Sequence, residues 1–572
     1  MSPVVLDQDG HTVENFQILN EQKDDSRFTA SLKYEGQETF RLGEIQLFDA
    51  PHGYEGDCEV YGEGYQMLTQ SEGTLSQRQA LTKYTDEGHY RLPSPQGMAT
   101  VHNLLHFEPM SADSRLLAFS SCRRFAGEFR YDGQSLQIAL CGDGILVEPG
   151  DVLELEDFIE IQGPREKCFQ ILGQEMAQNH PILTWSQRPT GWCSWYCYGP
   201  EVTEQDITDN MAALGSMKTP LDYIQIDDGY QAAMGDWLLQ DKAFPTPIKD
   251  LCQNIRSAGK KPAIWIAPFI AEEGSKLFQE HPEYFVQDDE GKPLRSDRIT
   301  FGGWRRGPWY MLDGTHPEAR DYLRHVVKTM RDEWGVAYFK MDANVWGALG
   351  GRYHDPKAGR VEAYRRGMEA IVDEVGKDCF LLGCNAPMWP SLGLVHGMRV
   401  TGDVFRSNHH FYVLAREGLY RNWQHGTLWL NDPDCIVLDN LVVEQITPGG
   451  DVEAYPPLTQ EAFLYHATYI AATGGMLLSG DRLPSFSPRG QEILDKVAAL
   501  PGEAALFSGT DFERGELQSD EGHWLFLLNH DENESRQYSL PQGAQAYLLP
   551  KTALLKEDSL ELPPFSGAIF SL

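Results

Sequence analysis

The sequence predicts an α/β protein built on a (β/α)8 TIM barrel, with a β-sandwich domain before the barrel and a small β-domain after it. Three observations lead to this fold class. Strand patterns without helices fill the first part of the chain, strand and helix patterns alternate through the middle, and strand patterns return at the end. We therefore divide the 572 residues into an N-terminal β-sandwich at 1–165, a barrel at 166–488 and a C-terminal antiparallel β-domain at 489–572.

The first 165 residues consist of short segments rich in β-forming residues, such as FTASLKYEG, GEFRYDG and SLQIALCGDGILV. Gly and Asp separate these segments, as expected of turns. Runs of strands without helices are typical of a sandwich. A helical pattern at 166–178 then marks the first domain boundary, near Gly163.

Eight strand patterns alternate with helical patterns in the middle of the chain. The strand patterns lie at 191–198, 221–228, 262–269, 335–342, 379–385, 397–404, 426–432 and 472–481. Their number and their span of roughly 290 residues match a TIM barrel. A doubly wound open sheet is the alternative, but it has no need of eight units and the sequence contains no GxGxxG. Beyond a helical pattern at 491–500, short strand segments predict the C-terminal domain.

The formal net charge is −36, from 48 basic and 84 acidic residues, which argues against nucleic acid and anionic membranes as partners. A saline habitat or selection for solubility is an alternative source of this acidity. The ten cysteines form no CxxC pair, which favours reduced thiols over a zinc site or a disulfide framework. Because the N-terminus shows no signal-peptide pattern and no apolar run reaches ~18 residues, we expect a soluble, cytoplasmic protein.

Polar and aromatic residues recur where the predicted barrel strands end. In a TIM barrel the carboxyl ends of the strands form the active site, so these side chains are the candidate functional residues. They are Trp195, Asp227, Asp228, Trp265, Lys340, Asp342, Cys384, Asn385, Arg399, Asp403 and Asp432. Burying a carboxylate at such a position is costly unless the group has a partner or a purpose.

The motif YFKMD places Lys340 and Asp342 on the same side of one strand, because side chains two residues apart share a face. A lysine beside a carboxylate lowers the carboxylate's pKa and keeps it ionised, which suits a nucleophile. A structural ion pair at the barrel rim is the alternative interpretation.

The motif RVTGD places Asp403 four residues after Arg399, so the strand must turn or bulge before Asp403 reaches the same pocket. A partly desolvated acid in this less rigid position can hold its proton near neutral pH. The alternative is a helix N-cap, which is a common role for Asp in a βα loop.

The motif IDDGY ends another strand with adjacent carboxylates, Asp227 and Asp228, which can accept hydrogen bonds from vicinal hydroxyl groups. Metal binding is the alternative, since hard cations favour paired carboxylates. No second cluster of His or Glu occurs at ligand spacing, and the pair His409 and His410 lacks a zinc spacing, so we favour sugar hydroxyls.

Seven motifs in one order resemble the α-galactosidases of glycoside hydrolase family 36. They are GWCSWY, IDDGYQ followed by GDW and FP, IWIAPF followed by EHPEYF, LDGTHPEARDYL, YFKMDAN, GCNAP and RVTGD. The resemblance covers the barrel, about residues 185 to 480, and the flanking β-domains fit the three-part layout of that family.

The resemblance implies a retaining enzyme that hydrolyses terminal α-galactosides of the melibiose or raffinose type through a covalent galactosyl–enzyme. Asp342 would be the nucleophile, and Asp403 would protonate the leaving oxygen and then deprotonate water. It implies no cofactor and no metal.

The resemblance also implies a set of substrate contacts. Asp227 and Asp228 would hold the 4- and 6-hydroxyls that distinguish galactose from glucose. The remaining contacts would come from Lys340 and Arg399 on other ring hydroxyls, Trp265 stacked on the sugar, Cys384 and Asn385 near the 2-hydroxyl, Trp195 in the pocket wall, and either Arg305 or Arg306. The chain departs from the family pattern twice, with Tyr65 in YGEGYQML where a Trp-rich loop is common and Tyr230 where DDGW is common. Both substitutions bear on aglycone preference more than on the reaction.

Four alternatives stay open at this point. An α-N-acetylgalactosaminidase or a raffinose-synthase-like transgalactosylase would use the same aspartates, and would differ around Cys384 and Asn385 or in acceptor access. A non-catalytic galactoside-binding protein would be expected to lack Asp342 or Asp403, and a metal-dependent barrel hydrolase or lyase would need clustered ligands. Exposed sheet edges in the two β-domains are consistent with a homo-oligomer.

Overall fold

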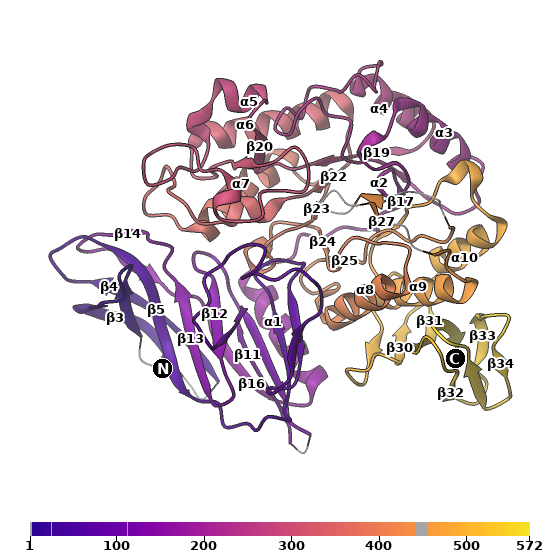
Figure 1. Cartoon of the computed structure of the whole chain (residues 1–572), viewed down its shortest axis with the longest axis horizontal. Coiled ribbons are helices and arrows are strands. Elements are labelled where there is room, and N and C mark those ends of the chain that lie inside the picture. The colour runs from indigo at the N-terminus through magenta and orange to yellow at the C-terminus, as the bar shows by residue number, and fades with distance from the viewer. Residues whose placement is uncertain (1–2, 24–25, 111, 441–444, 447–451, 454–455) are drawn as a thin grey trace.

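The computed structural model describes residues 3–23, 26–110, 112–440, 445–446, 452–453 and 456–572. Figure 1 shows three parts: N-terminal sheets in indigo and purple, a ring of helices around parallel strands, and a yellow β-domain at the C-terminal end. The fold class expected from the sequence is confirmed.

The N-terminal part is a pair of antiparallel sheets. The first contains, in spatial order, β2 (Thr12–Val13), β1 (Val4–Asp7), β5 (Phe40–Pro51), β13 (Ser135–Cys141), β12 (Gly127–Tyr131) and β9 (Ala99–His102), with β14 (Leu146–Val147) on β5. The second contains β15 (Val152–Glu154), β4 (Arg27–Tyr34), β16 (Phe158–Gly163), β11 (Ser114–Phe119), β10 (Leu104–Glu108), β6 (Glu59–Glu63), β7 (Gln70–Gly73) and β8 (Arg78–Ala80), with β3 (Phe16–Lys23) on β4. Alternate residues of both sheets, including Leu105, Phe119 and Phe129, form one buried apolar cluster.

The barrel strands follow the eight predicted segments. They are β17 (Thr190–Cys193), β18 (Tyr223–Ile226), β19 (Lys261–Ile266), β22 (Tyr338–Met341), β23 (Phe380–Gly383), β24 (Gly397–Arg399), β25 (Leu430–Asp432) and β28 (Leu477–Ser479). Their order in the sheet is β25-β24-β23-β22-β19-β18-β17-β28, with parallel pairing throughout. A parallel bridge between Ile436, after β25, and Ser479 of β28 connects the two outer strands of the sheet. Because all strands are parallel, their carboxyl ends lie at one rim.

Helices between the strands cover the outside of the sheet (Figure 1). They are α3 (Glu204–Leu214), α4 (Ile248–Ser257), α5 (Lys276–Glu280), α6 (Pro317–Thr329), α7 (Arg360–Val375), α8 (Asn408–Tyr420), α9 (Gln460–Thr473) and α10 (Pro488–Ala498), and α1 (Arg165–Asn179) precedes the barrel. Local signals explain their limits: Thr203 and Asp206 form a capping box at the start of α3, and Gly376 with a φ of 63° ends α7.

All eight barrel strands are shorter than their predicted segments, and for two of them the local cause is clear. The segment expected at 191–198 leaves the sheet after Cys193, and α2 (Trp195–Tyr198) follows at once. The segment expected at 472–481 begins only at Leu477, because α9 extends to Thr473 and Gly474 and Gly475 then turn the chain with positive φ angles. Two antiparallel strand pairs that the sequence did not predict are β20 (Ile270–Glu272) with β21 (Trp309–Met311) and β26 (Gln445–Ile446) with β27 (Val452–Glu453).

The C-terminal β-domain consists of a five-stranded and a three-stranded antiparallel sheet. The first holds β29 (Leu506–Phe507), β30 (Arg514–Ser519), β31 (Gly522–Asn529), β36 (Ser566–Ser571) and β33 (Gln545–Leu548), and the second β32 (Arg536–Ser539), β35 (Ser559–Leu562) and β34 (Leu554–Leu555). Strand β36 packs closely on α9, since a Cβ on Gly567 would lie 2.4 Å from the Thr468 hydroxyl.

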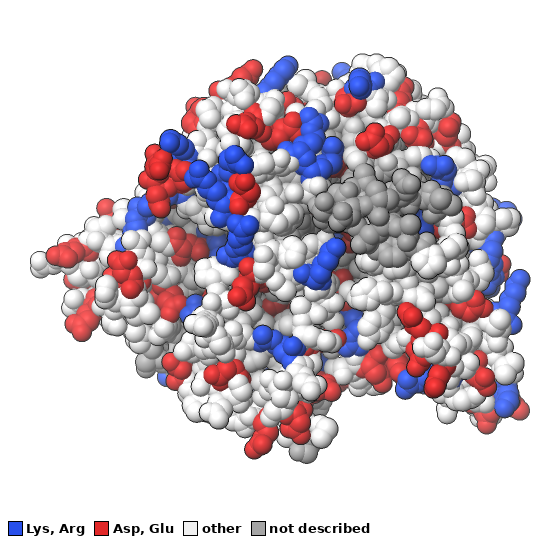
Figure 2. All heavy atoms as spheres, viewed as in Figure 1, with Lys and Arg blue, Asp and Glu red and all other residues white. Residues whose placement is uncertain are grey.

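Acidic side chains are spread over the whole visible face, with Lys and Arg scattered among them, in keeping with the net charge of −36 (Figure 2). Within the described part of the chain, no helix combines the length and the apolar character needed to cross a membrane.

Candidate active site

Asp342 lies directly after the last residue of β22, at the barrel rim. Its Oδ1 accepts the Ala343 N–H at 2.6 Å, and its Oδ2 accepts the Trp265 indole N–H at 3.0 Å. Ala343 has a φ of 52°, a left-handed conformation that is rare for alanine and common at functional sites. These contacts fix both oxygens of the carboxylate.

Lys340 lies two residues earlier on the same strand, and its Nζ binds Asp227 Oδ2 at 3.0 Å. Lys340 lowers the pKa of Asp342, as expected, but burial has a larger effect in the opposite direction. Burial raises the pKa of Asp342 above its ordinary value, the charge of Lys340 opposes this, and the charge of Asp403 adds to it. The predicted net lowering is therefore wrong for the structure as it stands.

Asp227 and Asp228 end β18 and point to different partners. Asp227 Oδ2 also accepts the Gln225 side-chain N–H at 2.6 Å, while Asp228 Oδ1 accepts that of Gln231 at 2.6 Å. Both carboxylates are 1% exposed. Each of the two carboxylates therefore has its own side-chain partners: Gln225 and Lys340 bind Asp227, and Gln231 binds Asp228.

The sequence left open whether Arg305 or Arg306 belongs to the site. Arg305 Nε donates to Asp228 Oδ2 at 2.7 Å, and its Nη2 donates to Oδ1 of the same carboxylate. Arg306 turns away and pairs with Glu272 at 2.6 Å. The structure thus brings Arg305, rather than Arg306, into contact with the candidate residues.

Asp403 lies beyond the end of β24 and is 48% exposed. Its Oδ1 accepts a hydrogen bond from Arg399 Nη2 at 2.9 Å and one from the Tyr196 hydroxyl at 3.2 Å. Arg399, by contrast, is 1% exposed and also pairs with Asp434 at 2.5 Å. Burial raises the pKa of Asp434 to about 7 and raises that of Asp432 at the end of β25.

Cys384 and Asn385 follow β23. The Cys384 sulfur accepts a hydrogen bond from Arg399 Nη1 at 3.7 Å. Asn385 has a φ of 41°, and two residues of the N-terminal domain contact it: the Tyr90 hydroxyl donates to its Oδ1 at 3.1 Å, and its N–H donates to the Met67 sulfur at 3.1 Å. The N-terminal domain therefore forms part of this rim.

Tyr65 lies in the same N-terminal loop, which pairs with the barrel through its backbone. The Met67 N–H donates to the Ala386 carbonyl at 3.0 Å, and the Met388 N–H to the Tyr65 carbonyl at 2.9 Å. The Tyr65 side chain is fully buried and donates its hydroxyl to the Ala348 carbonyl at 3.0 Å. Its described contacts are thus structural ones between the two domains.

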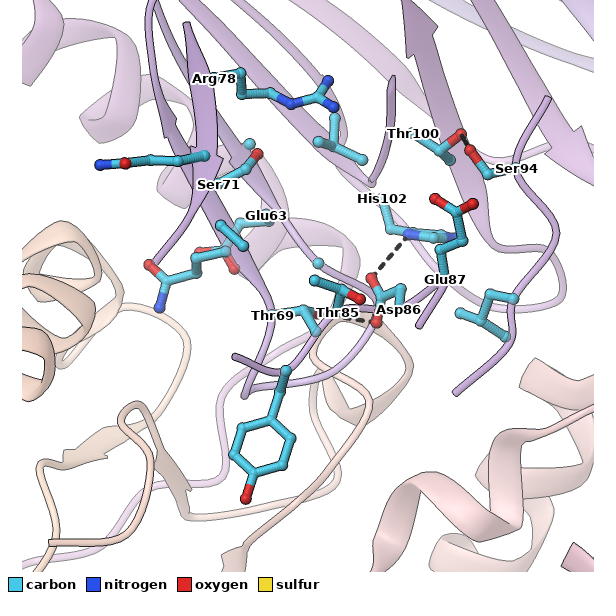
Figure 3. Close-up of a pocket in the computed structure, with 18 of the residues that line it drawn as sticks. Glu63, Thr69, Ser71, Arg78, Thr85, Asp86, Glu87, Ser94, Thr100 and His102 are labelled. Atoms are coloured by element: carbon cyan, nitrogen blue, oxygen red, sulfur yellow. Dashed lines mark hydrogen bonds and ion pairs between the residues drawn. The ribbon is translucent and has the colours of Figure 1, made fainter. Parts of the chain in front are cut away.

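A polar cavity of about 240 Å³ lies behind this loop, inside the N-terminal domain (Figure 3). Asp86 joins the cavity to the loop: its Oδ2 accepts the Tyr65 N–H at 2.7 Å and lies 3.3 Å from His102 Nδ1, and its Oδ1 accepts the Thr69 hydroxyl at 2.9 Å. None of the strand-end candidates lines this cavity. Asp86, in the wall of this cavity, therefore holds the loop that reaches Asn385. The cavity itself is separate from the carboxylates of the barrel rim.

The two tryptophans predicted at strand ends occupy different environments. Trp265 is 1% exposed, packs edge-on against Trp237 with ring centroids 5.7 Å apart, and contacts Asp342 through its N–H. Trp195 is half-buried at the start of α2, where the helical turn directs the next residue, Tyr196, to Asp403. Trp304, beside Arg305, is a half-buried aromatic residue that the sequence analysis did not single out.

The described residues contain one group with metal-ligand geometry: Asp7, Asp9 and His11. It lies in the first turn of the N-terminal domain, where Asp7 Oδ1 accepts the backbone N–H groups of Asp9 and His11. This turn explains the grouping. At the barrel rim Lys340 pairs with Asp227, and Arg399 pairs with Asp403 and Asp434.

A family model described as "Glycosyl hydrolases family 31 TIM-barrel domain" matches residues 190–434, which include seven of the eight barrel strands. The mouse protein "Myogenesis-regulating glycosidase" is 28% identical over 153 residues, which is 27% of this chain and 20% of that protein. The "A type blood alpha-D-galactosamine galactosaminidase" of Flavonifractor plautii is 26% identical over 230 residues, 37% of this chain and 20% of that protein. The chain thus aligns with about a fifth of the length of these curated relatives.

Solved structures match over a larger part of the chain. The α-galactosidase TtGalA from Thermus thermophilus, in complex with p-nitrophenyl α-D-galactopyranoside, has a TM-score of 0.64 at 20% identity and covers 88% of this chain and 97% of its own. The GH36 α-galactosidase AgaA from Geobacillus stearothermophilus has a TM-score of 0.62 at 12% identity and covers 100% of this chain and 88% of its own. The barrel therefore resembles the barrels of glycoside hydrolases. The whole fold is GH36-like, which confirms, at the level of the fold, the resemblance seen in the motifs.

Proposed function

We propose that the protein is a retaining α-galactosidase that removes terminal α-D-galactosyl residues from oligosaccharides of the melibiose or raffinose type. The observation that carries this proposal is a pair of carboxylates in unlike environments at one barrel rim. Asp342 is held by the indole of Trp265 and a backbone N–H, whereas Asp403 is half exposed beside Arg399. Glycosidases use such a pair as nucleophile and acid/base.

In the first step Asp342 attacks the anomeric carbon while the bond to the leaving oxygen breaks, and Asp403 gives that oxygen a proton. In the second step Asp403 takes a proton from water, the water oxygen bonds to the anomeric carbon, and Asp342 is released. The N–H groups on Asp342 orient its oxygens for attack.

Recognition of the sugar falls to the groups around this pair. Asp227 and Asp228 accept hydrogen bonds from the 4- and 6-hydroxyls, and Lys340 and Arg305 hold these carboxylates in place. Asn385 lies on the side assigned to the 2-hydroxyl. An epimer that lacks a hydroxyl group at the expected position leaves the buried carboxylates without their partners. Such a site therefore discriminates strongly against epimers of galactose.

The names of similar proteins support this proposal. Relatives include "Alpha-galactosidase Mel36A" of Lactobacillus acidophilus and an "Alpha-galactosidase" of Escherichia coli, and similar folds have been solved in complex with stachyose and raffinose. A second candidate, α-N-acetylgalactosaminidase, is favoured by one observation, the galactosaminidase among the relatives.

Hydrolysis of p-nitrophenyl α-galactoside, measured beside the α-GalNAc, α-glucoside and β-galactoside analogues with Asp342→Ala as the control, tests the proposal. We expect activity on the α-galactoside, lost in the variant, and release of α-galactose as the first product by NMR. Preference for α-GalNAc would favour the second candidate. Folded protein without activity on any substrate would contradict the proposal, and release of β-galactose would contradict retention.

A further inference from the structure

Asp403 is not held by the strand that precedes it. Strand β24 ends at Arg399, and Asp403 comes four residues later. The Val400 N–H still donates to the Asp432 carbonyl of β25 at 3.0 Å, and Asp403 lies three residues beyond this bond. An acid/base group must nevertheless lie within hydrogen-bond reach of the leaving oxygen. Other contacts must therefore fix this segment.

Two buried carboxyl groups bind the backbone on either side of Asp403. Glu417 Oε2 accepts the Gly402 N–H at 2.9 Å, and Asp434 Oδ2 accepts the Val404 N–H at 2.7 Å. Between them, Arg399 donates to the Gly402 carbonyl at 3.3 Å and to Asp403 itself. The residues before and after Asp403 are thus held by two different elements, α8 and the segment after β25.

We propose that Glu417 and Asp434 form a carboxylate clamp that positions Asp403 for proton transfer to and from the substrate. They are positioning residues, since they act through the backbone of the Gly402–Val404 segment. The proposal rests on the assignment of Asp403 as acid/base in the proposed function.

The burial of Glu417 argues that the clamp is more than packing. Glu417 lies on α8 and is 0% exposed, at a helix position that an apolar side chain would fill at lower cost if packing were its only task. Its Oε1 has no hydrogen-bond partner among the described residues, so the Gly402 N–H is the contact that the carboxyl group makes. Burial raises the pKa of Glu417 to about 7, as it does for Asp434.

Asp434 differs from Glu417 in binding three partners at once. Its Oδ1 accepts the Cys435 N–H at 2.7 Å, and its Oδ2 contacts Arg399 as well as the Val404 N–H. Because Arg399 also lies against Asp403, substitution of Asp434 would disturb the acid/base group directly. Glu417 acts on Asp403 and Arg399 through its charge, and its described hydrogen bond is to the Gly402 backbone, which makes it the cleaner test of the clamp.

The test compares Glu417→Ala with Glu417→Gln, which keeps an oxygen acceptor for the Gly402 N–H. Glu72→Ala is the matched control, because Glu72 accepts hydrogen bonds from Arg416 and Tyr420 on the same helix but does not touch Gly402. For each variant, kcat/KM is measured on melibiose, a poor leaving group, and on p-nitrophenyl α-galactoside, a good one. Thermal unfolding confirms that each variant is folded.

We expect Glu417→Ala to lose about 10–100-fold on melibiose and no more than about 3-fold on the nitrophenyl substrate, since a misplaced proton donor harms the substrate that needs protonation. Glu417→Gln and Glu72→Ala should keep the wild-type ratio of the two substrates. Equal losses on both substrates in Glu417→Ala, or no loss on either, would overturn the proposal.

Amide hydrogen exchange provides a readout that does not depend on activity. Protection of the Arg399–Arg406 segment should fall in Glu417→Ala and stay near wild type in Glu417→Gln and Glu72→Ala. Unchanged protection in Glu417→Ala contradicts the clamp even if the wild type proves inactive. An inactive wild type with the expected exchange pattern would contradict the proposed function and leave the clamp standing.

Discussion

The ends of β22 and β24 hold their aspartates in different ways. Asp342 is the first residue after β22, so the sheet itself, the next backbone N–H and the indole of Trp265 fix its position. Asp403 comes four residues after β24, is half exposed, and depends on side chains from α2, α8 and the segment after β25. In the proposed mechanism, the group that bonds to carbon is thus attached to the rigid sheet, and the group that transfers protons lies on a supported loop.

This difference has a physical rationale. Nucleophilic attack requires a near-attack geometry with the reacting atoms about 3–3.5 Å apart, and a strand end with two hydrogen bonds to the carboxylate supplies such precision. Proton transfer serves two partners in turn, the leaving oxygen and water, which occupy similar but not identical positions. A loop held by hydrogen bonds can serve both. The predictions below separate the two regions.

Substitution of Asp342 should have the largest effect. Asp342→Ala removes the group that bonds to the anomeric carbon, so kcat/KM should fall by at least about 10⁴-fold on every α-galactoside, whatever the leaving group. Steady-state rates on the nitrophenyl and disaccharide substrates measure this. Added azide that restores turnover with the β-configured product would support the assignment, whereas substantial remaining activity would show that another carboxylate is the nucleophile.

Substitution of Asp403 should have an effect that depends on the leaving group. Asp403→Ala should lower kcat/KM about 10²–10⁴-fold on melibiose and only a few-fold on p-nitrophenyl α-galactoside, since a good leaving group needs little protonation. If both substrates lose equally, Asp403 is not the acid. The contrast with Asp342→Ala, which makes no such distinction, separates the two regions most directly.

Arg305→Ala should cause a smaller loss. The substitution removes two charge-assisted hydrogen bonds from buried Asp228, and bonds of this kind contribute about 1.5–3 kcal/mol each. We expect about a 10–100-fold fall in kcat/KM on both substrates alike, because binding rather than protonation is impaired. Arg306→Ala is the control: its partner is Glu272, and its rates should stay within about 2-fold of wild type. Similar losses in both variants would contradict the assignment of Arg305 to the site.

The candidate residues at the ends of β22 and β18 could be predicted from the sequence, because each depends only on its position within one strand. The period of a strand places Lys340 and Asp342 on one face, and the adjacent Asp227 and Asp228 follow an apolar segment of the same kind. The surroundings of these side chains were harder to predict from the sequence. Lys340 binds Asp227, and burial of Asp342 outweighs its charge, since both effects depend on which elements pack around the strand ends.

The β24 side was predicted less well because its contacts are distant in sequence. Tyr196 was missed because the segment after Cys193 turns into a helix, which presents a neighbour of the expected Trp195. Glu417 is one acidic residue within a helix, and no local pattern marks it as buried. Tyr90 comes from another domain altogether, and only the packing of that domain on the barrel brings it to Asn385.

The smallest expected effect is a shift of the pH profile, and it tests whether the two regions share one electrostatic environment. Asp342 must be ionised to attack, and burial raises its pKa above the ordinary 3.8, so kcat/KM should fall as the pH drops through that higher value. The charge of Asp403 contributes to the raised pKa. In Asp403→Asn the acidic limb, measured with p-nitrophenyl α-galactoside, should therefore move to lower pH. In Lys340→Met, which removes a charge that lowers the pKa of Asp342, the limb should move to higher pH. Shifts in opposite directions would show that Asp342 responds to both neighbours, whereas an unmoved limb in both variants would mean that another group controls the acidic side of the profile.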